Sequence, residues 1–269
     1  MKPAARKILR RTLWIVLLVA VVLLAKFILH LLLPRNFNAS GEHLPIELRS
    51  GAFETLYYCS TDEPKGILIV GTGDGGWSYW EERVAKHAMA QGYAVGSWDC
   101  RKFADSRKFG QADLIEGFNK AVEAVRERSD ADDDCPVWFT GWSTGAEWAL
   151  AAAASPDREP NLVGVLPAAP GDRSRYGITK SDLLGLTPEG PDSFALADLA
   201  PALNGICVAQ FAAGLDPMDD VTWLKRLGPG CPHKVVDIPG VLHDMGGAGD
   251  RFLAELDQAM RWSLENMPR

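Results

Sequence analysis

The stretch Pro136-Val-Trp-Phe-Thr-Gly-Trp-Ser-Thr-Gly145 runs directly into an alanine-rich segment, residues 146–154. β-Branched and aromatic residues favour a strand up to Thr140, and the alanines favour a helix after the second glycine. Between strand and helix, glycines flank Ser143 two residues away on each side. Small residues are needed at both places when a strand turns tightly into a helix and lifts a serine hydroxyl above a sheet.

A strand, G-x-S-x-G and a helix in this order form the nucleophile elbow of the α/β-hydrolase fold. Apolar runs and amphipathic segments alternate along the rest of the chain, which predicts an α/β fold: a mostly parallel sheet with helices on both faces. Between the strand 93–98 and the helix 111–128, we expect a charged loop that contains Arg101, Lys102, Arg107 and Lys108. The Gly- and Pro-punctuated stretch 167–194 is expected to be irregular and to lie where a cap would sit. The other expected strands cover residues 44–49, 53–59, 66–70, 136–140, 162–166, 206–212 and 234–238. Three more helices are expected: one that begins at residue 78, one over residues 146–154 and one over residues 251–267.

A serine becomes a nucleophile when a base takes its proton and a carboxylate fixes the tautomer of that base. Ser143 is the candidate nucleophile, and this fold carries its three groups in the chain order Ser, Asp, His. Of the five histidines, only His243 lies in a loop between the last expected strand and the final helix, so it is the candidate base. Asp216 is the preferred acid because Gly214 and Pro217 place it in a turn after the strand 206–212. Asp219 and Asp220 follow the same strand and remain alternatives.

An oxyanion hole needs two backbone N–H groups that converge on one point. The amide of Thr144, which follows the nucleophile, is the first candidate, and Asp74 in the glycine-rich loop after the strand 66–70 is the second. The Asp74 side chain must then point elsewhere, either to a substrate ammonium or to the helix that begins near Ser78, where Glu81 would complete a capping box. The loop matches no nucleotide-binding motif, and the cysteines have no zinc-ligand spacing, so no cofactor or metal is expected.

Residues 1–43 are expected to lie outside the hydrolase domain, which would cover 44–269. Residues 1–12 are basic, and residues 13–33 are apolar except for Lys26 and His30, enough for a transmembrane helix of about 30 Å. The basic excess before this segment puts the N-terminus in the cytoplasm and the domain in the periplasm. Because no small-x-small cleavage site closely follows Ala25, an uncleaved signal anchor is favoured over a cleavable signal peptide. Residues 34–43 would be the linker.

Charge is distributed unevenly along the chain. Residues 1–35 contain seven Lys and Arg and no acid, which leaves 21 basic against 35 acidic residues and a net charge of −14 in the remainder. This charge argues against nucleic acid and anionic lipid as partners, and it would attract a cationic substrate. Taken alone, it favours the alternative of a soluble surface whose like charges repel one another. In an oxidising compartment one or two disulfides are expected among the five cysteines. Cys207 and Cys231, each near the start of one of the last two strands, are the preferred pair.

Several segments together resemble one bacterial family. They are Gly73-Asp-Gly-Gly-Trp77 after a strand, the strand end Trp98-Asp99, Gly141-Trp-Ser-Thr-Gly-Ala146, and Pro239-Gly followed by His243. In these segments the chain is similar to the VirJ/AcvB-type virulence proteins, exported α/β-hydrolase-like proteins linked to type IV secretion and to hydrolysis of lysyl-phosphatidylglycerol. The resemblance covers Gly66 to the C-terminus and implies Ser143 as nucleophile and His243 as base. It also implies an ester or lipid substrate and a secretion-system or envelope protein as a partner.

We therefore expect a serine esterase anchored in the bacterial inner membrane by a single span, with its catalytic domain in the periplasm. Its substrate would be a carboxylic ester such as an aminoacylated phospholipid. The alternative is a non-catalytic hydrolase-fold module that binds a secretion or envelope partner, and a weaker third hypothesis is a peptidase or a lipase of ordinary acyl esters. The ordered Ser, Asp and His favour the enzyme, because a binding module does not need all three groups.

Overall fold

One central sheet dominates the part of the chain that the computed structural model describes, residues 3–106 and 110–268. Its strands are β1 (Glu42–Leu48), β2 (Gly51–Tyr58), β3 (Ile67–Gly71), β4 (Ala94–Trp98), β5 (Val137–Trp142), β6 (Leu162–Ala168), β9 (Cys207–Ala213) and β10 (His233–Ile238). They follow the order β1-β2-β4-β3-β5-β6-β9-β10 across the sheet. β2 pairs antiparallel with both β1 and β4, and the remaining pairs are parallel. The prediction of a mostly parallel sheet is confirmed.

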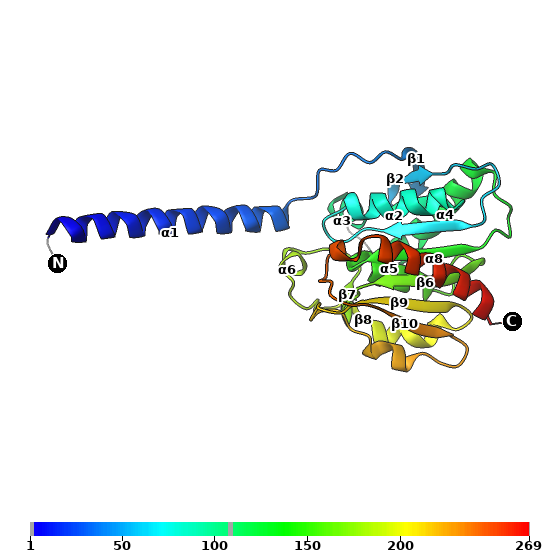
Figure 1. Ribbon diagram of the computed structural model, residues 1–269. Helices are drawn as coiled ribbons and strands as arrows, with labels where there is room; N and C mark the ends of the chain where they lie inside the picture. The colour runs from blue at the N-terminus through cyan, green and yellow to red at the C-terminus, as the bar shows by residue number, and fades with distance from the viewer. Residues whose placement is uncertain (1–2, 107–109, 269) are drawn as a thin grey trace.

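Helices lie on both sides of this sheet (Figure 1). The α-helices of the described residues are α1 (Pro3–Leu32), α2 (Tyr79–Ala90), α3 (Cys100–Ser106), α4 (Gln111–Ser129), α5 (Thr144–Ala153), α6 (Lys180–Leu183), α7 (Leu196–Leu199) and α8 (Gly249–Asn266). Short 3₁₀ turns cover Ala200–Leu203, Thr222–Arg226 and Gly246–Ala248.

The sheet separates two apolar cores, as β3 illustrates. Ile67 and Ile69 pack into the core shared with α4 and α5, whereas Leu68 and Val70 pack into the core shared with α2 and α8. All four side chains are fully buried. Successive strand residues point to opposite faces, so a parallel strand covered on both faces needs a continuous apolar run rather than alternation.

Two regions differ from the sequence prediction. Residues 100–106 form α3 where a charged loop was expected, because Phe103 is fully buried and packs on Trp98, with ring centroids 4.7 Å apart. Arg107 and Lys108 of that expected loop lie outside the described residues. The irregular stretch 167–194 contains a small hairpin of β7 (Arg173–Arg175) and β8 (Ser193–Ala195), with α6 between its strands.

The N-terminal segment forms one long helix, α1, which Figure 1 shows as a rod leading away from the sheet. It contains residues 13–32 of the segment in which we expected a membrane span. Within the ranges that the structure describes, however, no helix has the length and apolarity needed to cross a membrane. The transmembrane part of the fold prediction is therefore not confirmed. The sheet begins at Glu42, two residues before the expected start of the domain.

All five cysteines are free thiols, so the expected Cys207–Cys231 disulfide was a wrong prediction for this structure. The Cys207 thiol donates to the Ser263 carbonyl oxygen at 3.4 Å and so points toward α8. Burial raises the pKa of Cys207 to about 11 and that of Cys231 to about 12. Both thiols therefore stay protonated near neutral pH.

Candidate active site

Ser143 lies at the tight turn between β5 and α5, with φ +53° and ψ −123°. A positive φ is uncommon for a residue with a side chain and here turns the serine out of the strand. Glycines make the turn possible. A Cβ on Gly141 would lie 2.5 Å from the Gly145 carbonyl carbon, and a Cβ on Gly145 would lie 2.4 Å from that of Gly71. The expected strand–turn–helix geometry is therefore present, and β3 packs directly against it.

The structure brings the three preferred residues into one hydrogen-bonded series. His243 Nε2 lies 2.9 Å from Ser143 Oγ, and His243 Nδ1 lies 2.7 Å from Asp216 Oδ2. The Asp216 side chain is only 2% exposed, against 31% for His243. A buried carboxylate on Nδ1 favours the tautomer whose Nε2 can accept the serine proton.

Geometry distinguishes Asp216 from the two alternative acids. Asp219 accepts hydrogen bonds from Gln210 Nε2 at 2.8 Å and from the Ala213 N–H at 2.6 Å, so it is tied to the end of β9. Burial raises the pKa of Asp219 to about 6. Asp220 accepts hydrogen bonds from the backbone and the hydroxyl of Thr222 at 3.0 and 2.9 Å. Neither carboxylate occupies the place beside His243.

The candidate base His243 and the candidate acid Asp216 lie on two loops that a backbone hydrogen bond joins. The Leu215 N–H donates to the Val241 carbonyl at 2.9 Å, which joins the loop of Asp216 to the loop of His243. Trp142 Nε1 donates to the His243 carbonyl oxygen at 2.5 Å, and the indole and imidazole centroids lie 5.5 Å apart. The residue before the serine thus holds the backbone of the histidine.

Both residues expected to form the oxyanion hole line the same cavity as Ser143 and His243. Thr144 is the first residue of α5, where a helix leaves backbone N–H groups without partners inside the helix. Asp74 lies in the turn after β3, and Arg101 Nη1 donates to its carbonyl oxygen at 3.4 Å. Burial raises the pKa of Asp74, and the charges of Arg35, His243 and Arg101 oppose this rise.

The side-chain role suggested for Asp74 at the start of α2 is not observed. Ser78 caps the helix, because its hydroxyl accepts a hydrogen bond from the Trp80 N–H at 3.3 Å. Glu81 does not complete the expected capping box. It is fully buried, bonds the Ser78 hydroxyl, and accepts a weak hydrogen bond from the Gly73 N–H at 3.4 Å. Glu81 thus joins the loop that carries Asp74 to the start of α2.

A cavity of about 860 Å³ opens above Ser143. One wall contains Glu147, which lies one helical turn after the serine, is buried, and accepts a hydrogen bond from the Gly171 N–H at 3.0 Å. Burial raises the pKa of Glu147, and a hydrogen bond with Ser174 opposes the rise. Part of its rim is apolar, with Leu184, Leu186 and Met218 each at least half exposed. The cavity is therefore lined by both acidic and apolar side chains.

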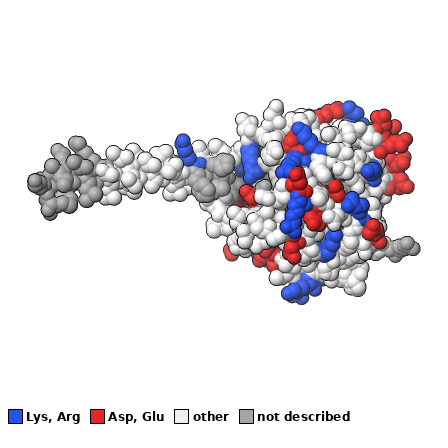
Figure 2. Space-filling view, viewed as in Figure 1, with Lys and Arg blue, Asp and Glu red and all other residues white. Residues whose placement is uncertain are grey.

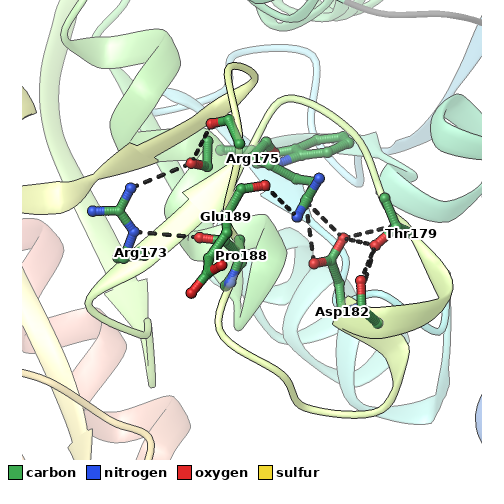
Figure 3. A network of polar contacts seen from close by, with 10 residues as sticks. Arg173, Arg175, Thr179, Asp182, Pro188 and Glu189 are labelled. Carbon is green, nitrogen blue, oxygen red and sulfur yellow. Dashed lines mark hydrogen bonds and ion pairs between the residues drawn. The ribbon is translucent and has the colours of Figure 1, made fainter.

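The cap over this cavity is held by two arginines of β7 (Figure 3). Arg173 Nε donates to the Pro188 carbonyl at 3.3 Å. Arg175 pairs with Asp182 at 3.0 Å and also donates to the Glu189 carbonyl at 3.0 Å. Asp182 in turn accepts a hydrogen bond from the Thr179 N–H at 2.7 Å. These contacts fix the segment 179–189, which supplies Leu184 and Leu186 of the apolar rim.

Charged side chains are spread over the visible face of the sheet domain, and acids gather at the end away from α1 (Figure 2). The exposed residues between α4 and β5 include Asp130, Asp132, Asp133 and Asp134. This cluster is remote from the cap, which Figure 1 places at the end from which α1 leaves. The acids in the cavity are therefore a separate feature from the acidic surface.

Two residues at the site were not found by sequence reasoning. Glu147 was included in an alanine-rich helix, although its spacing of four from Ser143 places it on the same helix face. Arg35 was assigned to a linker, yet it lines the cavity. No local signal in the sequence marks that contact. Among the described residues, no group of three or more His, Cys, Asp or Glu could hold a metal ion.

Comparisons with known proteins show the fold. No protein-family model and no curated protein matches the chain. Its structure is similar to an α/β hydrolase from Penicillium sp. sh18 (TM-score 0.62, 13% identity, 84% of this chain and 98% of that one). It is also similar to a thermostable carboxyl esterase from Bacillus coagulans (0.60, 16%, 85% and 99%) and to a soluble variant of monoglyceride lipase from Saccharomyces cerevisiae (0.55, 13%, 88% and 100%). The chain has the α/β-hydrolase fold.

Proposed function

We propose that the protein is a serine hydrolase that cleaves carboxylic esters. The observation that carries this proposal is the continuous series of hydrogen bonds from Asp216 through His243 to Ser143, placed at the elbow and open to a cavity. Serine hydrolysis needs these three roles at these distances. The carboxyl esterase and the lipase with the same fold add general support.

The reaction would proceed in two steps. Ser143 Oγ attacks the ester carbonyl carbon while His243 Nε2 takes the hydroxyl proton, and Asp216 stabilises the resulting imidazolium. The amides of Thr144 and Asp74 donate to the oxyanion of the tetrahedral intermediate. His243 then gives its proton to the leaving alcohol as the ester C–O bond breaks. A water, deprotonated by His243, then attacks the acyl-serine. The bond between the acyl carbon and Ser143 Oγ breaks, His243 returns the proton to Oγ, and the acid is released.

The cavity favours an amphiphilic ester with a cationic group as the substrate. Its apolar rim suits an acyl chain, whereas Glu147 and Asp172 line its wall and would attract an ammonium. An aminoacylated phospholipid such as lysyl-phosphatidylglycerol has both parts, in agreement with the VirJ/AcvB resemblance. Asp182 is a poorer ammonium partner because Arg175 already pairs with it.

Recognition of the ammonium can be tested with matched substrates. Acetylating the amine of lysyl-phosphatidylglycerol, or replacing Asp172 by Asn, should lower kcat/KM about tenfold or more, the value of one charged hydrogen bond. Equal rates on the native and the N-acetylated lipid would contradict recognition of the ammonium, and the proposal would then be reduced to an esterase without this specificity.

The proposed location is the periplasmic side of the bacterial inner membrane, with residues 1–12 in the cytoplasm. The basic N-terminus followed by an apolar segment supports this orientation. A reporter that is active only outside the cytoplasm should work when it is fused after residue 45. Activity of a cytoplasmic reporter at the same position would reverse the orientation.

The catalytic proposal is tested by a fluorophosphonate probe and a p-nitrophenyl ester. Wild type should be labelled at Ser143 and turn over the ester, and Ser143→Ala should lose both while keeping its melting temperature. Ser60→Ala, an exposed serine outside the cavity, is the matched control and should behave as wild type. A folded wild-type protein that neither reacts with the probe nor hydrolyses esters would favour the alternative, a binding module of the envelope or of type IV secretion.

A further inference from the structure

The segment between α1 and the sheet reaches the candidate active site through Arg35. Its backbone N–H donates to the Gly75 carbonyl at 2.8 Å, so this residue is bonded to the loop that carries Asp74. Its side chain lies against the same loop, because a Cβ added at Gly75 would be 2.7 Å from Arg35 Nε. Arg35 also lines the cavity above Ser143.

The Arg35 guanidinium also contacts the other half of the site. Its Cζ lies 5.1 Å from the centroid of the Trp142 ring, within the range of a cation–π interaction. Trp142 immediately precedes Ser143 and donates to the His243 carbonyl. A single side chain therefore joins the Asp74 loop to the tryptophan that supports both the nucleophile and the base.

Besides the buried Glu81, the charge of Arg35 acts on Asp74. Burial raises the pKa of this carboxyl, and Arg35 is the largest of the charges that oppose the rise, ahead of His243 and Arg101. If the Asp74 amide donates to the oxyanion, its own carboxylate adds a negative charge near the place where another one develops. A cation beside Asp74 offsets that repulsion in a site partly shielded from water.

We propose that Arg35 is a positioning residue for ester hydrolysis, which holds the 73–76 loop against Trp142 and offsets the charge of Asp74 beside the oxyanion hole. The inference rests on the proposed function. It makes the segment before the sheet a part of the active site rather than a passive linker. Arg35 acts through Asp74 and Trp142, so its contribution belongs to the transition state more than to substrate binding.

The test uses the full chain and a p-nitrophenyl ester. Arg35→Met, which keeps an apolar chain of similar length and removes the charge, should lower kcat about tenfold and leave KM within about twofold. Arg35→Lys, which keeps the charge, should restore most of the lost kcat. Arg49→Met is the matched control, because Arg49 is exposed, pairs with Glu116 at 3.1 Å and lies outside the cavity lining.

A double-mutant cycle with Asp74→Asn identifies the mechanism. Asparagine keeps the backbone amide and removes the charge that Arg35 offsets, so Arg35→Met should cost about threefold or less in the Asp74→Asn background. The inference would be overturned if Arg35→Met kept the kcat of wild type, or if it lost the same factor of kcat in the wild-type chain and in Asp74→Asn. In either case the Ser143→Ala experiment would still support the proposed hydrolase. No turnover by wild type would instead overturn the proposed function, and this inference with it.

Discussion

Replacing Asp216 by Asn tests the hydrogen-bonded series with almost no change of shape. Asp216 uses both of its oxygens: Oδ1 accepts a hydrogen bond from the Met218 N–H at 2.9 Å, and Oδ2 lies 2.7 Å from His243 Nδ1. In Asp216→Asn the amide oxygen must stay toward Met218, because an NH₂ group there would face another N–H. The NH₂ group is then directed at His243 Nδ1.

This orientation sets the size of the effect. An NH₂ donor beside Nδ1 requires Nδ1 to be the acceptor, so the imidazole proton moves to Nε2. Nε2 lies 2.9 Å from Ser143 Oγ and can then no longer take the serine proton. The same change of tautomer in a serine protease lowers kcat about 10⁴-fold, or about 5.5 kcal/mol of activation free energy. We expect a loss of this order with KM nearly unchanged.

The measurement is kcat on a p-nitrophenyl ester, with the melting temperature as a check of folding. Asp220→Asn is the matched control, because the Asp220 carboxylate accepts its hydrogen bonds from Thr222 rather than from His243, and its kcat should stay within about twofold of wild type. A kcat for folded Asp216→Asn within about tenfold of wild type would refute the assignment of the acid. So would a larger loss in Asp219→Asn than in Asp216→Asn.

Three further predictions follow from the packing and the titrating groups. Gly145→Ala should lower the free energy of unfolding by about 1–3 kcal/mol and reduce probe labelling of Ser143, because the added Cβ would overlap the β3 backbone. The free energy is measured by denaturant titration, with Gly110→Ala as the control, because a Cβ added at Gly110 would be 4.0 Å from its nearest neighbour, Asp113 Oδ2. Burial raises the pKa of Asp219 from 3.8 to about 6. Between these two pH values the folded chain keeps a proton on Asp219 that the unfolded chain releases. The contribution of Asp219 to the stability of the fold therefore falls as the pH rises from 3.8 to about 6. The melting temperature of Asp219→Asn relative to wild type should therefore increase between these pH values, and a constant difference would contradict the shift. The denatured, non-reduced chain should titrate five thiols, and a smaller number would reveal a disulfide that the structure lacks.

Local sequence patterns predicted the strands of the sheet well and the connections less well. The run at β3 is apolar on both faces, which is the pattern that a strand buried between two helix layers requires. α3 was missed because Arg101 and Lys102 suggested a solvated loop, whereas the burial of Phe103 against Trp98 decides its conformation. Glu81 was assigned to a helix cap, but its partners are the Ser78 hydroxyl and the Gly73 amide.

The sequence alone was enough to predict the elbow and to single out His243 as the candidate base. G-x-S-x-G between a strand and a helix is a local arrangement, since each glycine is required by backbone contacts within a few residues or with the adjacent strand. His243 followed from its place in the chain order. The sequence preferred Asp216 but left Asp219 and Asp220 as alternatives, and only the structure separates these three neighbouring acids by the groups that each one contacts. The role of Arg35 depended even more on the structure. Arg35 precedes Ser143 by more than a hundred residues, and only the folded chain brings it against Trp142 and the loop that carries Asp74.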